Sequence, residues 1–228
     1  SLLQLLVEEV TGQSFASYMK EAVLVPLGML QSSYSSEDVS PDELVQFYNA
    51  DGSEALHYRY TSLAATSLYS SLADLELFFQ MHLEGGASHG IGRSVLTAET
   101  LELMRQPHAS TMGLDIWGLG TILFTSTEDG DYVVGHDGQS TPAINTAVRL
   151  NPQTGNGIIV LTTGHPDLAT LVASVWVFWK TGKFDSLLFT MLQGGMMSGL
   201  VIGWFALLGL GVVVGVRTWW TRRAHRLG

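Results

Sequence analysis

Cysteine is absent from the 228 residues, and basic residues are few, with 11 Lys and Arg against 21 Asp and Glu. Without cysteine the chain cannot form a disulfide, use a thiolate nucleophile or bind a metal through sulfur. The net charge of −10 argues against a nucleic-acid partner, because phosphates repel an acidic surface. The patterns H-E-x-x-H and G-x-S-x-G and a Gly-rich phosphate loop are also lacking, so we predict no metal site and no cofactor.

Formal charge is also missing from one long stretch, the 31 residues from Ser186 to Val216. About 20 apolar residues suffice to cross the hydrocarbon core of a bilayer. Tryptophans follow the stretch, as in an aromatic belt, and the positive-inside bias places the basic tail in the cytoplasm. The basic residues of this tail are Arg217, Arg222, Arg223 and Arg226. The sequence therefore predicts a protein of the cell membrane with its acidic part, which carries a net charge of −14, outside the cytoplasm.

The domain organisation follows from these patterns. We expect a folded domain over 1–183, a transmembrane helix over 186–216 and a basic cytoplasmic tail over 217–228. The chain opens at Ser1 on an apolar helical pattern, without an initiator methionine or a signal-peptide pattern, so we expect it to be part of a longer protein.

Glycines recur every four residues in the uncharged stretch, at Gly195, Gly199 and Gly203. Such spacing lets two membrane helices approach closely. Glycine is also simply frequent in membrane helices, so helix–helix pairing and an isolated helix both remain open.

The folded part changes its hydrophobic period along the chain. Helical patterns come first: one ends at Gly12, and a second is capped by Ser14 and ends at Pro26. Strand-like runs follow at 117–126, 131–136, 143–150 and 157–164, with hairpin signals TEDGD and NPQTGN between or within them. A last helix covers 166–180. This order predicts an α+β fold with an antiparallel sheet flanked by helices.

The stretch VVGHDGQS (133–140) places His136 between two glycines at the end of a strand-like run. A His-x-Gly tripeptide arises about once by chance in a chain of this composition, so its position carries the argument. Glycines let a ligand approach the backbone, and an imidazole can donate, accept or carry charge near neutral pH. The backbone N–H of Gln139, just past Gly138, could stabilise an oxyanion. An ordinary turn is the alternative.

Ser17 and Lys20 match the Ser-x-x-Lys pattern of serine β-lactamases and penicillin-binding proteins. A nucleophilic pair needs a desolvated lysine behind the serine. Lys20 lies on a helix with a polar face, so we predict a solvated lysine and no nucleophile here.

Four segments carry a resemblance by their order. They are LLQLLVEEVTGQSFASYMKEAVLVPLGM (2–29), SLYSSLADLELFFQMHLEGG (67–86), WGLGTILF with VVGHDGQ (117–124 and 133–139), and AINTAVRLNPQTGNGIIVLTTG (143–164). In the same order, they resemble four parts of one protein family. The first resembles its helix pair ending in P-L-G-M, and the second resembles a later helix. The third resembles the strands with its third active-site motif (His-x-Gly or Lys-Thr-Gly), and the fourth resembles its last two strands. This family is the β-lactamase-related serine hydrolases, which includes class C β-lactamases and penicillin-binding-protein-like proteins.

The resemblance implies roles for the opening motif. His136 and Gly138 would face the substrate, with Ser140 also in the substrate-binding set. The Gln139 amide would be one of two oxyanion donors, and His136 would orient the substrate or assist proton transfer. The implied substrate is a small molecule or peptide with an amide or ester bond.

The chain also departs from the family pattern. The Ser-x-x-Lys nucleophile and the Tyr-x-Asn base motif are expected before its first helix, and FYNA at 47–50 has the wrong place and spacing. Residues 65–68, ATSL, replace the family's Ala-Gly-Gly-Leu, which puts the geometry of that turn in doubt. We expect the chain to contribute to a membrane-anchored serine hydrolase and to be inert by itself. A non-catalytic pseudoenzyme or binding module, or a tethered structural domain, is the alternative.

Overall fold

The computed structural model describes residues 1–83, 95–111, 113–141 and 143–227. The chain divides into two units, Ser1–Ser186 and Leu187–Gly228. The helices and helical turns are α1 Leu2–Thr11, α2 Phe15–Met19, the π-turn η1 Lys20–Leu24, α3 Val25–Leu27, the 3₁₀ turn η2 Pro41–Glu43, α4 Leu63–Thr66, α5 Leu72–Gln80, α6 Ala98–Arg105, α7 Leu168–Thr181 and α8 Ser186–Leu227. The strands are β1 Phe47–Tyr48, β2 Glu54–Ala55, β3 Ala109–Thr111, β4 Leu114–Trp117, β5 Ile122–Ser126, β6 Tyr132–Ser140, β7 Ile144–Leu150 and β8 Gly157–Thr163.

Strands β3 to β8 form an antiparallel sheet in which every strand pairs with its neighbour in sequence. Both predicted hairpins are present, joining β5 to β6 and β7 to β8. The predicted strand over 117–126 is in fact two strands, because the chain reverses between Trp117 and Ile122. Gly118 donates its N–H to the carbonyl oxygen of Thr121 in this turn, and a side chain at Gly118 would overlap the carbonyl of Met104. The predicted α+β class is confirmed.

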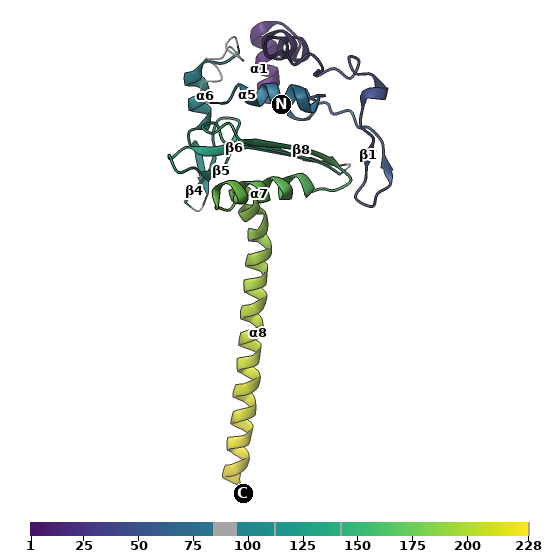
Figure 1. The fold of residues 1–228 in the computed structure, drawn as a ribbon. Helices are drawn as coiled ribbons and strands as arrows, with labels where there is room; N and C mark the ends of the chain where they lie inside the picture. Colours follow the sequence, from purple (N-terminus) through teal and green to yellow (C-terminus); the bar gives the residue numbers. More distant parts are fainter. Residues whose placement is uncertain (84–94, 112, 142, 228) are drawn as a thin grey trace. The chain divides into compact units, whose positions relative to one another are not determined.

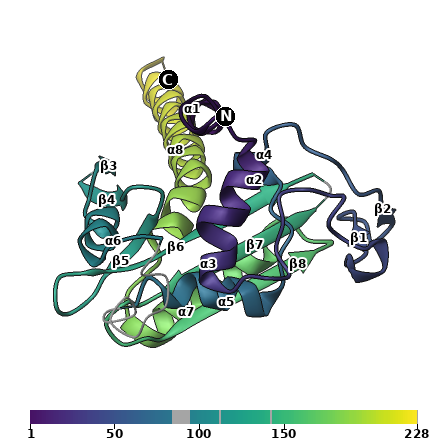
Figure 2. The ribbon, with the colours of Figure 1, turned by 90° about the horizontal axis from the view of Figure 1, so that it is seen from above.

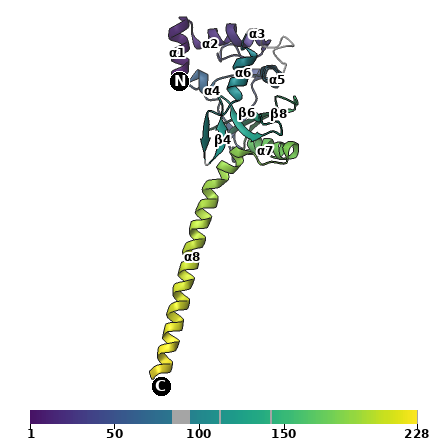
Figure 3. The ribbon, with the colours of Figure 1, turned by 90° about the vertical axis from the view of Figure 1, so that its left-hand side faces the viewer.

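The sheet has a helix on each face, as Figures 1 and 3 show for α5 and α7. On one face, Phe79 of α5 packs against the buried Leu123, Val134 and Leu150 of three adjacent strands. On the other face, small residues let α7 lie close to the sheet, where Ala169 and Ala173 pack against Ala147, Ile158 and Val160. Because side chains alternate along a strand, successive residues of β6 face α5 and α7 in turn.

The N-terminal helices begin and end largely where the sequence predicts. Gly12, with a φ of 69°, ends α1, and the hydroxyl of Ser14 accepts the N–H of Ser17 at the start of α2. The predicted end at Pro26 is wrong, because the helical path continues through η1 and α3 to Gly28, whose φ is 79°. Pro26 lies at the start of α3, directly after the π-turn.

A long insertion connects α3 to α4 and carries the β1–β2 ribbon, which lies beside β8 in Figure 2. The Tyr48 N–H donates to Thr163 Oγ1 over 2.9 Å, and the hydroxyl of Tyr60 donates to the carbonyl of Thr141 over 3.1 Å. The insertion is therefore attached to the sheet near the end of β6.

Helix α8 contains a segment, Ser198–Arg217, that is long and apolar enough to cross a membrane, with a mean hydropathy of 2.4. The described side chains between Leu200 and Arg217 are exposed along this helix.

Candidate functional site

The candidate site lies on the second half of β6, where the strand loses one of its two neighbours. In the described residues, β5 pairs with β6 only as far as Gly135, whereas β7 pairs with it from Val134 to Ser140. Residues 136–140 therefore form a segment with one paired side and one open edge, which we call the open half of β6.

His136 projects from the open half on the face opposite α7. Its neighbour Asp137 is bonded to Thr170 of α7, and adjacent residues of a strand point to opposite faces. The ring is exposed, and its centroid lies 5.7 Å from that of Trp117 on β4. Nδ1 lies 2.7 Å from the carbonyl oxygen of Asp137. Because that oxygen can only accept, Nδ1 carries the proton, and Nε2 of the neutral ring is an acceptor.

The register places the N–H of Gln139 on the open edge. The carbonyl oxygen of its partner Asn145 accepts a bond from Thr162 Oγ1 of β8 over 2.9 Å. In an antiparallel strand the N–H and C=O of one residue point to the same neighbour, so those of Asn145 face β8. Gln139 therefore directs its own N–H away from β7 and toward the edge that β5 leaves open.

The side chain of Gln139 has a separate, anchoring contact. Its Nε2 donates to the carbonyl of Pro166 and to Oδ1 of Asp167, both over 2.9 Å, at the start of α7. The amide side chain thus anchors Gln139 on the α7 face of the strand, while its backbone N–H points to the open edge.

The other two predicted residues, Gly138 and Ser140, lie on the same face as His136, and both are half-buried. A Cβ at Gly138 would press against Oγ1 of Thr146, its partner on β7. The four predicted residues are therefore brought together on one short segment, with one face and one edge accessible.

A buried ion network, which sequence reasoning missed, lies under the open half on the α7 face. Arg149, fully buried on β7, binds Asp137 with two guanidinium nitrogens and donates from Nε to Asp185 Oδ2 over 2.8 Å. Thr170 donates to Asp137 over 2.6 Å. The Arg149 guanidinium also lies 3.5 Å from the centroid of the Phe124 ring. A charged residue within the apolar run AVRL was the available signal, because a buried arginine requires a partner.

Asn145 extends this network to the backbone of the motif. Its Nδ2 donates to the carbonyl of Gly138 over 3.0 Å, and its Oδ1 accepts the N–H of Thr170 over 2.9 Å. The peptide between Gly138 and Gln139 is therefore held by a buried side chain.

The Ser-x-x-Lys match is not built as a nucleophile. Lys20 is exposed, and its Nζ lies 3.8 Å from Oδ2 of the equally exposed Asp38. Ser17 is exposed and accepts a bond from the hydroxyl of Ser14 over 3.0 Å. Lys20 is therefore solvated among the described residues, as the sequence predicts.

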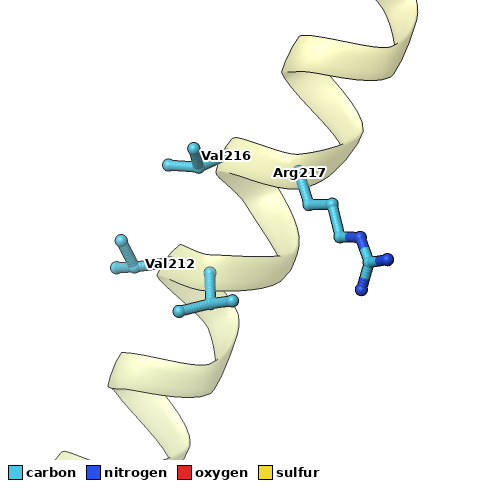
Figure 4. A pocket seen from close by; sticks show the side chains of 4 residues that line it. Val212, Val216 and Arg217 are labelled. Carbon is cyan, nitrogen blue, oxygen red and sulfur yellow. The ribbon is translucent and has the colours of Figure 1, made fainter.

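Other candidate features lack the chemistry of a site. Among the described residues, no three His, Asp or Glu side chains are grouped as metal ligands. A hollow on α8 is lined by Val212, Val213, Val216 and Arg217 (Figure 4). Its lining comes from one exposed helix, so it is a surface groove between side chains.

The fold and the motif together define a class: an α+β protein whose sheet presents a His-x-Gly segment at a half-open strand. The family model of the β-lactamases, described as "Beta-lactamase", matches residues 1–173. The chain belongs to this family.

Solved structures agree with this assignment. The octameric penicillin-binding protein homologue from Pyrococcus abyssi is 26% identical, with a TM-score of 0.65 over 80% of this chain. The penicillin-binding protein from Bacillus halodurans is 21% identical, with a TM-score of 0.58 over 78% of this chain. Simvastatin synthase from Aspergillus terreus is 18% identical, with a TM-score of 0.51 over 74%. The last two show the fold alone.

The chain spans only part of these proteins: 41%, 53% and 50% of the three chains, in the same order. The comparison with curated proteins gives no match. Residues 84–86 of the second resembling segment lie outside the described residues. Ser67, in the place of a family glycine, has a φ of −117°, a conformation that any residue adopts.

Proposed function

We propose that the chain forms one wall of the active-site cleft of a membrane-anchored serine hydrolase. The hydrolase would act through an acyl-enzyme on an amide or ester bond of a peptidoglycan peptide, a β-lactam or an ester. The observation that carries the proposal is the open half of β6, where an exposed His136 and the Gln139 N–H share one accessible edge in a β-lactamase-family fold.

The proposed roles follow from this geometry. The N–H of Gln139 donates to the oxyanion of the tetrahedral intermediate, because a fixed donor needs no reorganisation during the reaction. His136 orients the substrate or assists proton transfer through Nε2. Gly138 and Ser140 line the substrate, with Gly138 allowing it to approach the strand.

The nucleophile and the base belong, in this proposal, to a Ser-x-x-Lys and a Tyr-x-Asn motif outside the 228 residues. The chain alone is then inert, because an oxyanion donor without a nucleophile has no covalent intermediate to stabilise. The acidic unit lies outside the cytoplasm, and α8 anchors it with the arginine tail inside. Pairing of α8 through Gly195, Gly199 and Gly203 stays a prediction.

A covalent probe tests the proposal. The 228-residue chain and the product of its complete coding sequence are each incubated with a fluorescent penicillin and a fluorophosphonate. We expect labelling of the complete product only. Labelling of the 228-residue chain would place a nucleophile within it and contradict the assigned roles.

Absence of labelling in both would support the second candidate, a binding module without catalysis. The specific observation in its favour is that the one Ser-x-x-Lys match in the sequence has its lysine in solvent.

A further inference from the structure

Helix α7 has two apolar faces of different character. The residues facing the sheet are buried and mostly small: Ala169, Thr170, Ala173, Ser174 and Val177. The residues on the opposite side are exposed and large, and they recur at intervals of three and four. Together with the exposed Phe184 that follows the helix, we call them the outer α7 face: Leu168, Leu171, Val172, Val175, Phe178, Trp179 and Phe184.

The exposure of the outer α7 face is high for side chains of this size. Val175, Trp179 and Phe184 are 68%, 72% and 76% exposed. A helix that is apolar on all sides is normally covered, and a contiguous exposed apolar patch marks an interaction surface. Water is therefore a poor partner for this face.

The chain leaves the first unit close to this face and at a fixed point. Asp185 is buried against Arg149, and Ser186 Oγ donates to the carbonyl of Leu123 over 2.9 Å. Only residues 182–185 separate the end of α7 from the start of α8. The outer α7 face thus lies within a few residues of the point where the uncharged helix begins.

The length of the uncharged stretch bears on how deep in the membrane the start of α8 lies. At about 1.5 Å per residue, the 31 residues from Ser186 to Val216 extend about 46 Å. A bilayer measures about 40–45 Å including its headgroups. The segment Ser198–Arg217 alone extends about 30 Å, the thickness of the hydrocarbon core. If the whole uncharged stretch lies within the bilayer and its headgroups, Asp185 lies at the headgroup level on one side and Arg217 on the other.

The chemistry of the outer α7 face fits a lipid interface. Aromatic rings gather at its C-terminal end, where Phe178 and Phe184 stack with centroids 5.3 Å apart. The Lys180 ammonium lies 4.3 Å from the centroid of the Trp179 ring. No acidic residue occurs from Leu168 to Phe184, so nothing on this segment repels anionic headgroups. Tryptophan and lysine beside an apolar face are typical of helices that lie in the membrane interface.

We infer that the outer α7 face lies on the surface of the bilayer that α8 enters, with Trp179 and Phe184 among the headgroups and Lys180 bound to anionic lipid. The inference rests on the membrane anchoring in the proposed function. It adds a second, peripheral contact that holds the first unit against the membrane.

The absence of cysteine makes a direct test possible. Single cysteines are introduced as Val175→Cys and Trp179→Cys, with two reference variants. Leu56→Cys reports an exposed apolar position on the insertion, and Leu207→Cys reports the middle of α8. Each full chain is labelled with a nitroxide in phosphatidylcholine–phosphatidylglycerol vesicles, and its collision rates with oxygen and with a water-soluble nickel chelate are measured.

We expect the labels at 175 and 179 to collide with the nickel chelate several-fold less often than the label at 56, while remaining accessible to oxygen. Nickel accessibility equal to that at position 56 would overturn the inference, because the face would be in water. Low accessibility to both reagents would overturn it as well, because protein would cover the face. A water-accessible label at 207 would instead contradict the anchoring by α8, so the two failures are distinguishable.

Discussion

The two halves of β6 differ in how they are held. Tyr132–Gly135 is paired with β5, and from Val134 with β7 as well, and Val133 and Val134 are almost fully buried. Among the described strands, only β7 pairs with His136–Ser140, and His136 and Gln139 are exposed. The paired half holds β6 in register with its neighbouring strands and supplies the buried core residues. The open half can therefore present an N–H and an imidazole without removing buried residues from the core.

The open half is nevertheless rigidly supported from one face. Arg149, Thr170 and Asn145 bind its side chains and backbone from the α7 face. A single strand thus combines a core segment with a site segment, and each half can be perturbed separately.

Removing the charge under the open half is expected to have the largest effect. Arg149→Met leaves the carboxylates of Asp137 and Asp185 without their shared counter-charge, which costs about 3–5 kcal/mol for a buried pair. The measurement is chemical denaturation of the chain in detergent. Lys20→Met is the control, because its exposed ion pair contributes less than about 1 kcal/mol. Equal losses in the two variants would show that the network carries no stability.

Acid is expected to destabilise the fold through His82, whose ring centroid lies 6.4 Å from that of Phe79, which packs against Val134 of the paired half. Burial and the nearby Arg105 lower the pKa of this imidazole from 6.5 to about 4. The folded state therefore holds it neutral, and below pH 6.5 the unfolded chain binds a proton that the folded chain does not. The free energy of unfolding should fall by about 3 kcal/mol as the pH drops from 7 to 4.

Denaturation curves measured between pH 4 and 7 test this expectation, because the range covers the pKa of His82 in the folded chain, about 4, and its ordinary value of 6.5. His82→Leu should flatten that dependence. His108→Gln, at an exposed position, should leave it unchanged. The same slope in His82→Leu and in the unmodified chain would assign the acid sensitivity to other groups.

Glycine-to-alanine substitutions in the two halves of β6 should differ in how much stability they cost. A Cβ at Gly135 overlaps the backbone carbonyl of Val148, which cannot move without breaking the ladder. A Cβ at Gly138 meets the side chain of Thr146, which can rotate. We expect Gly135→Ala to cost about 1–3 kcal/mol, as overpacking does, and Gly138→Ala to cost less. The thermal midpoints of the two variants measure this difference in stability. A larger loss for Gly138→Ala would contradict the view that the paired half is the more tightly packed one.

Substitution of His136 is expected to have the smallest effect in free energy, and this effect is on the rate of the reaction. In the complete protein, His136→Ala should lower the rate of acylation by a penicillin or fluorophosphonate about tenfold, which is about 1.4 kcal/mol. Its thermal midpoint should stay unchanged, since the ring is exposed. His108→Ala serves as the matched control. Unchanged acylation in His136→Ala would remove this residue from the proposed site.

Local patterns allowed much of this molecule to be predicted. Gly12, Ser14 and the two hairpin turns act within a few residues of themselves, and the antiparallel sheet follows from the turns between its strands. The length and lack of charge of α8 are likewise properties of consecutive residues. These features depend on short-range sterics and hydrophobicity, which a sequence displays directly.

Other features depend on which distant residues meet. The turn that breaks the run at 117–126 lies against the carbonyl of Met104 in α6, and the pairing of Arg149 with Asp137 and Asp185 requires β6, β7 and the end of α7 together. The sequence could indicate that Arg149 needs a partner, but not which one.

The sequence by itself determined the order of helices and strands and the uncharged helix, because each is encoded in neighbouring residues. Its prediction that the strand ends at His136 is wrong, because β6 continues to Ser140 through its pairing with β7. Only the tertiary structure decided that the pairing of β5 with β6 stops at Gly135, that the Gln139 N–H points to the open edge, and that α7 keeps a large apolar face uncovered by the described residues. The physical reason is that strand pairing and helix packing join residues far apart in the chain, and their register sets which groups are satisfied within the fold and which remain available for binding.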